Sequence, residues 1–166
     1  MKLKSTTQST QEPANKPQVL SPVLVTLDSP VYYYGNNILE ISKSGIYCSA
    51  IFASTILLNI DSVCTKYGVG IAHLGIYNPR QARGKNGVPL VPERWSNHAF
   101  GNAIDFKGVV FENSLISVKD LPKSKFPNLL SEIIDTCKDG IILIKRKPEI
   151  VNETEWYHIG LYQKNK

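Results

Sequence analysis

Cysteine is scarce in this chain, and its scarcity excludes a disulfide framework. The 166 residues contain only Cys48, Cys64 and Cys137, so at most one intrachain disulfide can form. No two of them make the CxxC pair that is typical of a structural zinc site or a redox motif. Because Cys64 and Cys137 fall within apolar helical patterns, we expect them to be buried thiols.

Long hydrophobic runs are missing as well. No segment approaches the ~20 apolar residues of a membrane-spanning helix, so the sequence predicts no membrane span. The N-terminus also lacks the apolar core of a secretory signal peptide. We therefore expect that an exported form of this chain uses another route or has already lost a leader.

Apolar residues are nearly absent from residues 1–18, which are rich in Ser, Thr, Gln, Pro, Asn and Lys. Such a segment cannot offset the conformational entropy of folding, so we expect a disordered tail or linker. Residues 19–166 then form one domain, because the chain is too short for two domains of ordinary size.

The formal net charge of +5 would suit a polyanionic partner, such as nucleic acid, an anionic membrane or an acidic cell-wall polymer. Much of the excess lies at the two ends of the chain, in Lys2, Lys4, Lys16, Lys164 and Lys166. No nucleic-acid-binding motif accompanies the charge, so we expect no nucleic-acid partner.

Helical and strand patterns are mixed along the domain. Apolar residues repeat at helical spacing over 49–67, followed by Gly68, and over 128–138, followed by Gly140. Segments rich in β-formers predict strands at 23–27, 31–34, 38–41, 69–77, 103–107, 109–111, 141–145 and 156–162, with a hairpin turn at 35–37. Because βαβ alternation is lacking, we expect an α+β fold with helices packed on a largely antiparallel sheet.

Residues 78–94 contain three prolines and two glycines, which predicts a long surface loop. Loops of this length without their own secondary structure are usually functional or disordered. This loop runs directly into a histidine motif, so we expect an active-site loop.

Histidine is also scarce, yet two of the three histidines have suggestive neighbours. His98 precedes Asp105 by seven residues across Gly101, whose missing Cβ permits a backbone reversal. His158 lies in an apolar and aromatic segment, where an unpaired imidazole would be costly to bury. Each histidine alone is more simply a hydrogen-bonded structural residue. Together with Asp105 and Glu155, they supply the ligands and spare carboxylate of a zinc hydrolase.

Two motifs carry a resemblance to a known superfamily. Ser-x-His-x-x-Gly-x-Ala-x-Asp at 96–105 and Glu-Trp-Tyr-His at 155–158 resemble motifs of the DD-peptidase and hedgehog-type zinc metallopeptidases. This superfamily includes D-alanyl-D-alanine carboxypeptidases and dipeptidases, peptidoglycan endopeptidases and the bacterial extensin-like C-terminal domain proteins. The extensin-like branch is the most similar, because segments 77–80 and 94–99 follow its arginine segment and its tryptophan-serine-x-histidine segment. The resemblance spans roughly residues 50–162.

The resemblance implies that His98, Asp105 and His158 bind one Zn²⁺ and that Glu155 is the general base. Residues 155 and 158 would point to opposite faces of an ideal strand, so Glu155 must lie just before the strand or on a bulge. An exposed structural glutamate is the alternative for this residue.

Superfamily members also place an arginine before the first motif, where it stabilises the developing oxyanion. Arg80 fits that position, and Arg83 is the alternative; both could instead be solvated loop cations. Ser96 is expected to shape the loop. Ser96 and His73 are also candidates for orienting the metal ligands without binding the metal themselves.

Two positions depart from the extensin-like branch, and they leave the substrate open. Pro79 stands where that branch usually has a cysteine, and Trp156 stands where it has an extra histidine. The Glu-Trp-aromatic-His form instead resembles the dipeptidase branch. Neither branch therefore fixes the bond that is cut.

The sequence as a whole predicts a zinc peptidase that hydrolyses peptide bonds of bacterial peptidoglycan stems, as a DD-carboxypeptidase or an endopeptidase. The alternative is a non-catalytic zinc- or peptidoglycan-binding module of the same fold. Glu155 argues against the alternative, since a purely structural site has no use for a spare carboxylate. The substrate class implies an extracytoplasmic location, and we expect a monomer.

Overall fold

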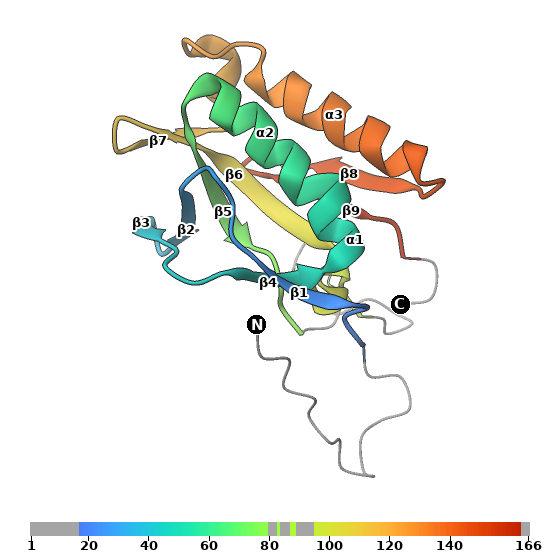
Figure 1. Cartoon of the computed structure of the whole chain (residues 1–166). Coiled ribbons are helices and arrows are strands. Elements are labelled where there is room, and N and C mark those ends of the chain that lie inside the picture. The colour runs from blue at the N-terminus through green and yellow to red at the C-terminus, as the bar shows by residue number, and fades with distance from the viewer. Residues whose placement is uncertain (1–16, 80–82, 84–86, 89–94, 164–166) are drawn as a thin grey trace.

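The protein is described by a computed structural model covering residues 17–79, 83, 87–88 and 95–163. The predicted tail at 1–18 lies almost wholly outside these residues. So does most of the predicted loop at 78–94. The described residues form one α+β domain, as the element pattern predicts (Figure 1).

A seven-stranded sheet forms the centre of the domain, in the order β3-β2-β5-β6-β9-β8, with β7 also paired to β6. Its strands are β2 (Val31–Gly35), β3 (Ile38–Ile41), β5 (Gly70–Gly75), β6 (Ala103–Phe111), β7 (Ser114–Ser117), β8 (Pro148–Asn152) and β9 (Tyr157–Leu161). All pairs are antiparallel except β2 with β5, which run parallel. The prediction of a largely antiparallel sheet is therefore confirmed.

The longest strand, β6, is the centre of this sheet. It pairs with β5, while β9 and β7 pair with successive stretches of it, Ala103–Phe106 and Gly108–Phe111. A separate antiparallel pair joins β1 (Pro22–Val25) to β4 (Ile46–Ser49). Thus β6 holds together segments that lie far apart in the sequence.

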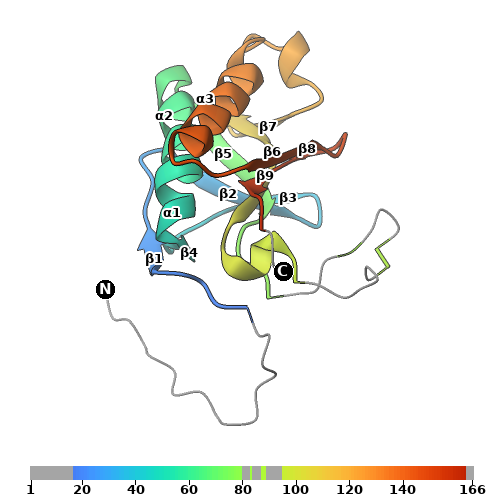
Figure 2. The same ribbon diagram turned by 90° about the vertical axis from the view of Figure 1, so that its right-hand side faces the viewer.

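Two long helical segments cover one face of the sheet (Figures 1 and 2). The first is continuous through α1 (Ala50–Phe52), a π-helical stretch (Ala53–Leu57) and α2 (Leu58–Tyr67), and it ends at Gly68 in the left-handed conformation. The second is α3 (Leu129–Leu143). Apolar side chains of both helices pack with fully buried sheet residues such as Ile104, Phe106 and Ile159.

The predicted strand at 141–145 is wrong, because α3 continues to Leu143. Gly140 therefore lies inside the helix, where it allows a close approach to the first helix. A Cβ at this position would lie 2.7 Å from Asn59 Nδ2 and 3.1 Å from the Thr55 carbonyl oxygen. The strand instead forms a few residues later, as β8, and short strands β4 and β7 were also not predicted.

A tight turn precedes β6. Residues Asn97–Phe100 form a 3-10 helix, which begins at Ser96 and ends at Gly101 in the left-handed conformation, with φ 65°. A Cβ at Gly101 would lie only 3.0 Å from Cys48 Cα and from the Ser49 amide nitrogen. The turn thus depends on glycine both for its φ angle and for its packing against β4.

Among the helices of the described part, none is long and apolar enough to cross a membrane.

Replacing Gly101 by alanine should destabilise the domain more than the same change at Gly68. Both glycines have a left-handed φ, but a Cβ at Gly68 meets nothing within 4 Å. We expect Gly68→Ala to lower the free energy of unfolding by about 1–2 kcal/mol through backbone strain. Gly101→Ala should lower it by roughly 2–4 kcal/mol, since the methyl group also displaces backbone. Chemical denaturation measures both; equal losses would contradict the packing role of Gly101.

Candidate metal centre

The pairing of β6 with β9 places Asp105 directly opposite His158. Side chains alternate along a strand, and Ile104, Phe106 and Ile159 belong to the core beneath the helices. Asp105 and His158 therefore project from the other face of the sheet, which the helices do not cover. Residues directly opposite on neighbouring strands have Cβ atoms about 5 Å apart, so their side chains can meet.

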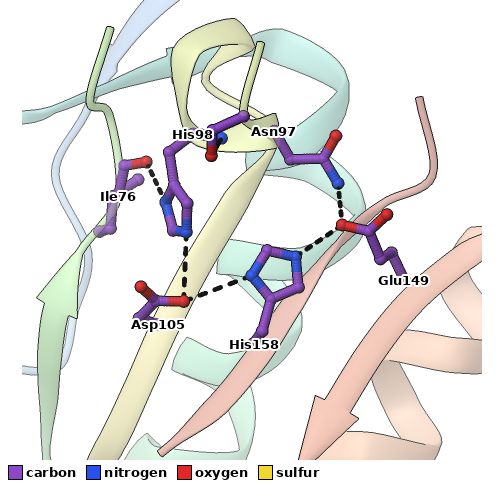
Figure 3. Close-up of polar contacts among 7 residues, drawn as sticks. Ile76, Asn97, His98, Asp105, Glu149 and His158 are labelled. Carbon is purple, nitrogen blue, oxygen red and sulfur yellow. Dashed lines mark hydrogen bonds and ion pairs between the residues drawn. The ribbon is translucent and has the colours of Figure 1, made fainter. Parts of the chain in front are cut away.

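The turn before β6 supplies the third side chain, His98. The Ser96 hydroxyl accepts a hydrogen bond of 3.2 Å from the His98 backbone N–H. The His98 carbonyl in turn accepts one of 3.0 Å from the Asn78 N–H. With the backbone held at these points, the buried His98 ring lies over the sheet beside Asp105 (Figure 3).

His98, Asp105 and His158 form a cluster that could hold a metal ion, with one ligand atom from each lying within 4.8 Å of the others. The Asp105 Oδ1 atom lies 3.1 Å from His98 Nε2 and 3.3 Å from His158 Nδ1. Two ligands held 2.0–2.1 Å from a tetrahedral zinc ion are about 3.3 Å apart. The two distances from Asp105 Oδ1 match the edges of such a tetrahedron.

The far nitrogen of each imidazole has its own hydrogen-bond partner (Figure 3). His98 Nδ1 lies 2.8 Å from the Ile76 carbonyl oxygen, which can only accept. In the neutral ring, the proton therefore lies on Nδ1, and Nε2 directs its lone pair towards Asp105. Metal-ligating histidines are normally oriented by such a bond to a carbonyl or a carboxylate.

His158 is oriented in the same way by a carboxylate. Its Nε2 lies 2.8 Å from Glu149 Oε1, and Glu149 also accepts a hydrogen bond from the Asn97 side-chain amide. His158 Nδ1 then faces Asp105. Glu149 projects from β8 on the same face, because its register partner is Gly160 and the residues at 158 and 160 share a face.

The electrostatics of the cluster favour a charged aspartate. Burial acts to raise the pKa of Asp105, but the hydrogen bonds and charges of His158 and His98 outweigh it and hold that pKa well below its usual value. For His158, burial acts to lower the pKa, while Asp105 and Glu149 raise it to about 9. A proton and a metal ion therefore compete for His158 Nδ1, as for most histidine ligands.

The sequence did not identify Glu149 as a site residue. The strand that carries it, β8, was predicted instead at 141–145, where the helix continues. The β-branched pair Ile150 and Val151, shortly after Pro148, was the local signal for this strand. Nothing local could have shown that the glutamate meets His158, because that contact depends on the pairing of β8 with β9.

Glu155 lies in the turn before β9, and not on the strand itself. Its exposed carboxylate lies 3.3 Å from Lys119 Nζ and 3.6 Å from Lys107 Nζ. The hydrogen bond and charge of Lys119 lower the pKa of Glu155, and Lys107 adds to the effect. Lys107 follows Asp105 by two residues on β6. The contact with Lys107 therefore places the Glu155 carboxylate further along β6 than the cluster.

The candidate supporting residues are placed as follows. Ser96 is buried and holds the His98 backbone through its hydroxyl. His73 is buried on β5, with its ring centre 5.7 Å from that of Tyr33. Burial lowers the His73 pKa to about 4, so this ring is neutral, and its Nδ1 has no hydrogen-bond partner within the described structure.

Of the two candidate arginines, Arg80 lies outside the described residues. Arg83 is described and is exposed. The prediction that Arg80 faces the cluster therefore lies outside the described residues.

No protein-family model, no curated protein and no solved structure matches this chain. The superfamily resemblance of the two motifs therefore stays a prediction. The support for a function comes from the geometry of His98, Asp105, His158 and their partners.

Proposed function

We propose that this protein is a zinc-dependent peptidase of the DD-peptidase and hedgehog-type superfamily, with the corresponding fold. The observation that carries the proposal is the cluster of His98, Asp105 and His158. Two imidazole nitrogens and one carboxylate oxygen are a common ligand set of catalytic zinc sites. Three protein ligands leave a fourth position free for water or substrate.

The partners of the two imidazoles also support a metal. With protons held on the outer nitrogens by the Ile76 carbonyl and by Glu149, both inner nitrogens present lone pairs to one carboxylate. Three acceptors facing one point need a cation between them, which is either a proton or a metal ion. Zinc bound there would lower the pKa of its water towards ~7 and polarise a substrate carbonyl.

Glu155 is the proposed general base. It lies just before β9, which meets the requirement set by its spacing from His158. Its carboxylate would have to leave Lys119 in order to take a proton from the attacking water. Arg80 is the proposed partner of the developing oxyanion, with Arg83 as the alternative.

The proposed substrate is a peptide stem of bacterial peptidoglycan, which implies an extracytoplasmic protein. One observation favours the alternative, a non-catalytic zinc- or peptidoglycan-binding module. The lysine contacts of Glu155 lower its pKa, and a base is most effective when its pKa lies near the working pH. Stoichiometric zinc without cleavage of purified peptidoglycan would support this alternative.

The protein should bind about one zinc ion per chain through the three clustered residues. We expect Asp105→Ala and His158→Ala to lose bound zinc, whereas Asp139→Ala, which alters an exposed aspartate of α3, should retain it. Elemental analysis after reconstitution and dialysis measures the metal content. Equal zinc contents in all the variants would place the metal elsewhere.

Glu149 should strengthen zinc binding without being a ligand. We expect Glu149→Gln to weaken zinc affinity by about 10–100-fold, because the neutral amide orients His158 less firmly and makes it less basic. Glu153→Gln, at an exposed position, is the matched control and should leave the affinity unchanged. Competition with a chromophoric chelator measures both constants. An unchanged affinity in Glu149→Gln would show that His158 does not depend on this carboxylate.

Removing the proposed base should slow turnover strongly and leave the bound metal in place. We expect Glu155→Gln to reduce kcat by about 10²–10⁴-fold with zinc content unchanged. Digestion of purified peptidoglycan, followed by mass spectrometry of the fragments, measures the loss and identifies the bond. Full activity in this variant would exclude Glu155 as the base.

The lysine contact should set the acid limb of the pH profile. Lys119 lowers the pKa of Glu155, so Lys119→Ala should raise that pKa, and the base would then be ionised only at higher pH. The acid limb of kcat/KM should therefore move to higher pH, whereas Lys123→Ala, at an exposed neighbouring lysine, should leave it in place. A shift to lower pH would contradict the assignment.

A further inference from the structure

A cavity of about 380 Å³ opens beside the candidate metal centre, at the point where β5 loses its parallel neighbour. Strand β2 pairs with β5 only as far as His73. Leu74, Gly75 and Ile76 continue past that point and line the cavity, and in the described part of the chain no strand pairs with them on this side, although Ile46 and Tyr47 of β4 also line the cavity. An unpaired strand edge offers backbone N–H and C=O groups to an extended peptide.

This edge is directly connected to the candidate metal centre. Gly75 is the register partner of Asp105, and the Ile76 carbonyl accepts the hydrogen bond from His98. Neighbouring strands lie about 4.8 Å apart, so the cavity begins roughly 5–10 Å from the Asp105 backbone. An extended peptide rises about 3.3 Å per residue and would cover this distance with two or three residues.

The walls of the cavity are aromatic and uncharged. Three tyrosines gather around it although each remains about two-fifths exposed: Tyr33 at 43%, Tyr47 at 42% and Tyr77 at 43%. Tyr47 and Tyr77 pack edge to face, with ring centres 4.9 Å apart. Exposed tyrosines that cluster in this way are typical of recognition sites. Ser42 and Asn78 add neutral polar groups, and the lining side chains that are described include no lysine, arginine or carboxylate.

We propose that this cavity is a substrate-recognition site, which binds an uncharged residue of the peptide two or three positions from the scissile bond. The peptide main chain extends along the edge of β5 at Leu74 and Gly75 and along the adjoining Ile76. The proposal rests on the proposed function, and it selects a substrate class that the motifs leave open. Peptides of about four residues or more are bound well, and a free dipeptide, which cannot reach the cavity from the metal, is bound weakly.

The position of bound peptide can be measured without catalysis. Protein treated with EDTA is titrated with the synthetic pentapeptide L-Ala-L-Ala-L-Ala-D-Ala-D-Ala, whose side chains are all uncharged, and, separately, with D-alanyl-D-alanine, while backbone amide signals are followed by NMR. We expect the pentapeptide to shift the amides of residues 74–77. The dipeptide should leave these signals unchanged. Shifts located elsewhere, or equal effects of the two probes, would overturn the proposal.

A matched pair of variants tests the cavity itself. Ser42 and Ser44 are both exposed and lie in the same loop, but only Ser42 lines this cavity. Ser42→Trp should fill it and weaken pentapeptide binding by about tenfold or more, which corresponds to about 1.4 kcal/mol. Ser44→Trp should bind like the unmodified protein. Equal affinities of the two variants would overturn the proposal.

The zinc-loaded protein separates this proposal from the proposed function. Pentapeptide binding at residues 74–77 with no cleavage would contradict the peptidase and leave the recognition site standing. Cleavage of pentapeptide and dipeptide with similar kcat/KM, unchanged by Ser42→Trp, would contradict the recognition site and leave the peptidase standing.

Discussion

The register between β6 and β9 is the constraint on which the candidate site depends. It pairs Asp105 with His158, residues separated by 53 positions in the chain. A slip of one residue would turn His158 towards the helices and bring Ile159 to the open face. The buried Ile159 opposes such a slip, because it would leave the core that it shares with Ile104 and Phe106 of β6. Packing on one face of the sheet therefore holds the geometry of the other.

The site is built in layers of hydrogen bonds around that pair. The Gly101 turn and Ser96 set the backbone of His98, and the Ile76 carbonyl sets its ring. Glu149 does the same for His158 from the neighbouring strand. The cluster concentrates two carboxylates and two imidazoles in a half-buried place, which is costly unless each charge has a partner. A metal ion shared by three of these groups would provide such a partner.

One face of the sheet forms the hydrophobic core, and the other carries the candidate site. Two helical segments bury the apolar face, so stability depends mainly on that side. The open face carries Asp105, His158 and Glu149, and the edge of β5 beside it is lined by partly exposed tyrosines. Because β2 leaves β5 after His73, the sheet has an unpaired edge within reach of the cluster. A peptide bound along this edge would extend towards the candidate metal centre, past Ile76, whose carbonyl holds His98.

The sequence by itself determined the features that depend on neighbouring residues. Apolar periodicity over 49–67 predicted the first helix, Asn36 and Asn37 predicted the hairpin of β2 with β3, and Gly101 predicted the reversal between His98 and Asp105. Only the tertiary structure decided that Gly140 lies within α3, that β8 carries Glu149 to His158, and that β5 has a free edge. These features arise from contacts between segments far apart in the chain. Strand pairing and helix packing create them, and they leave no period or turn signal in the local sequence.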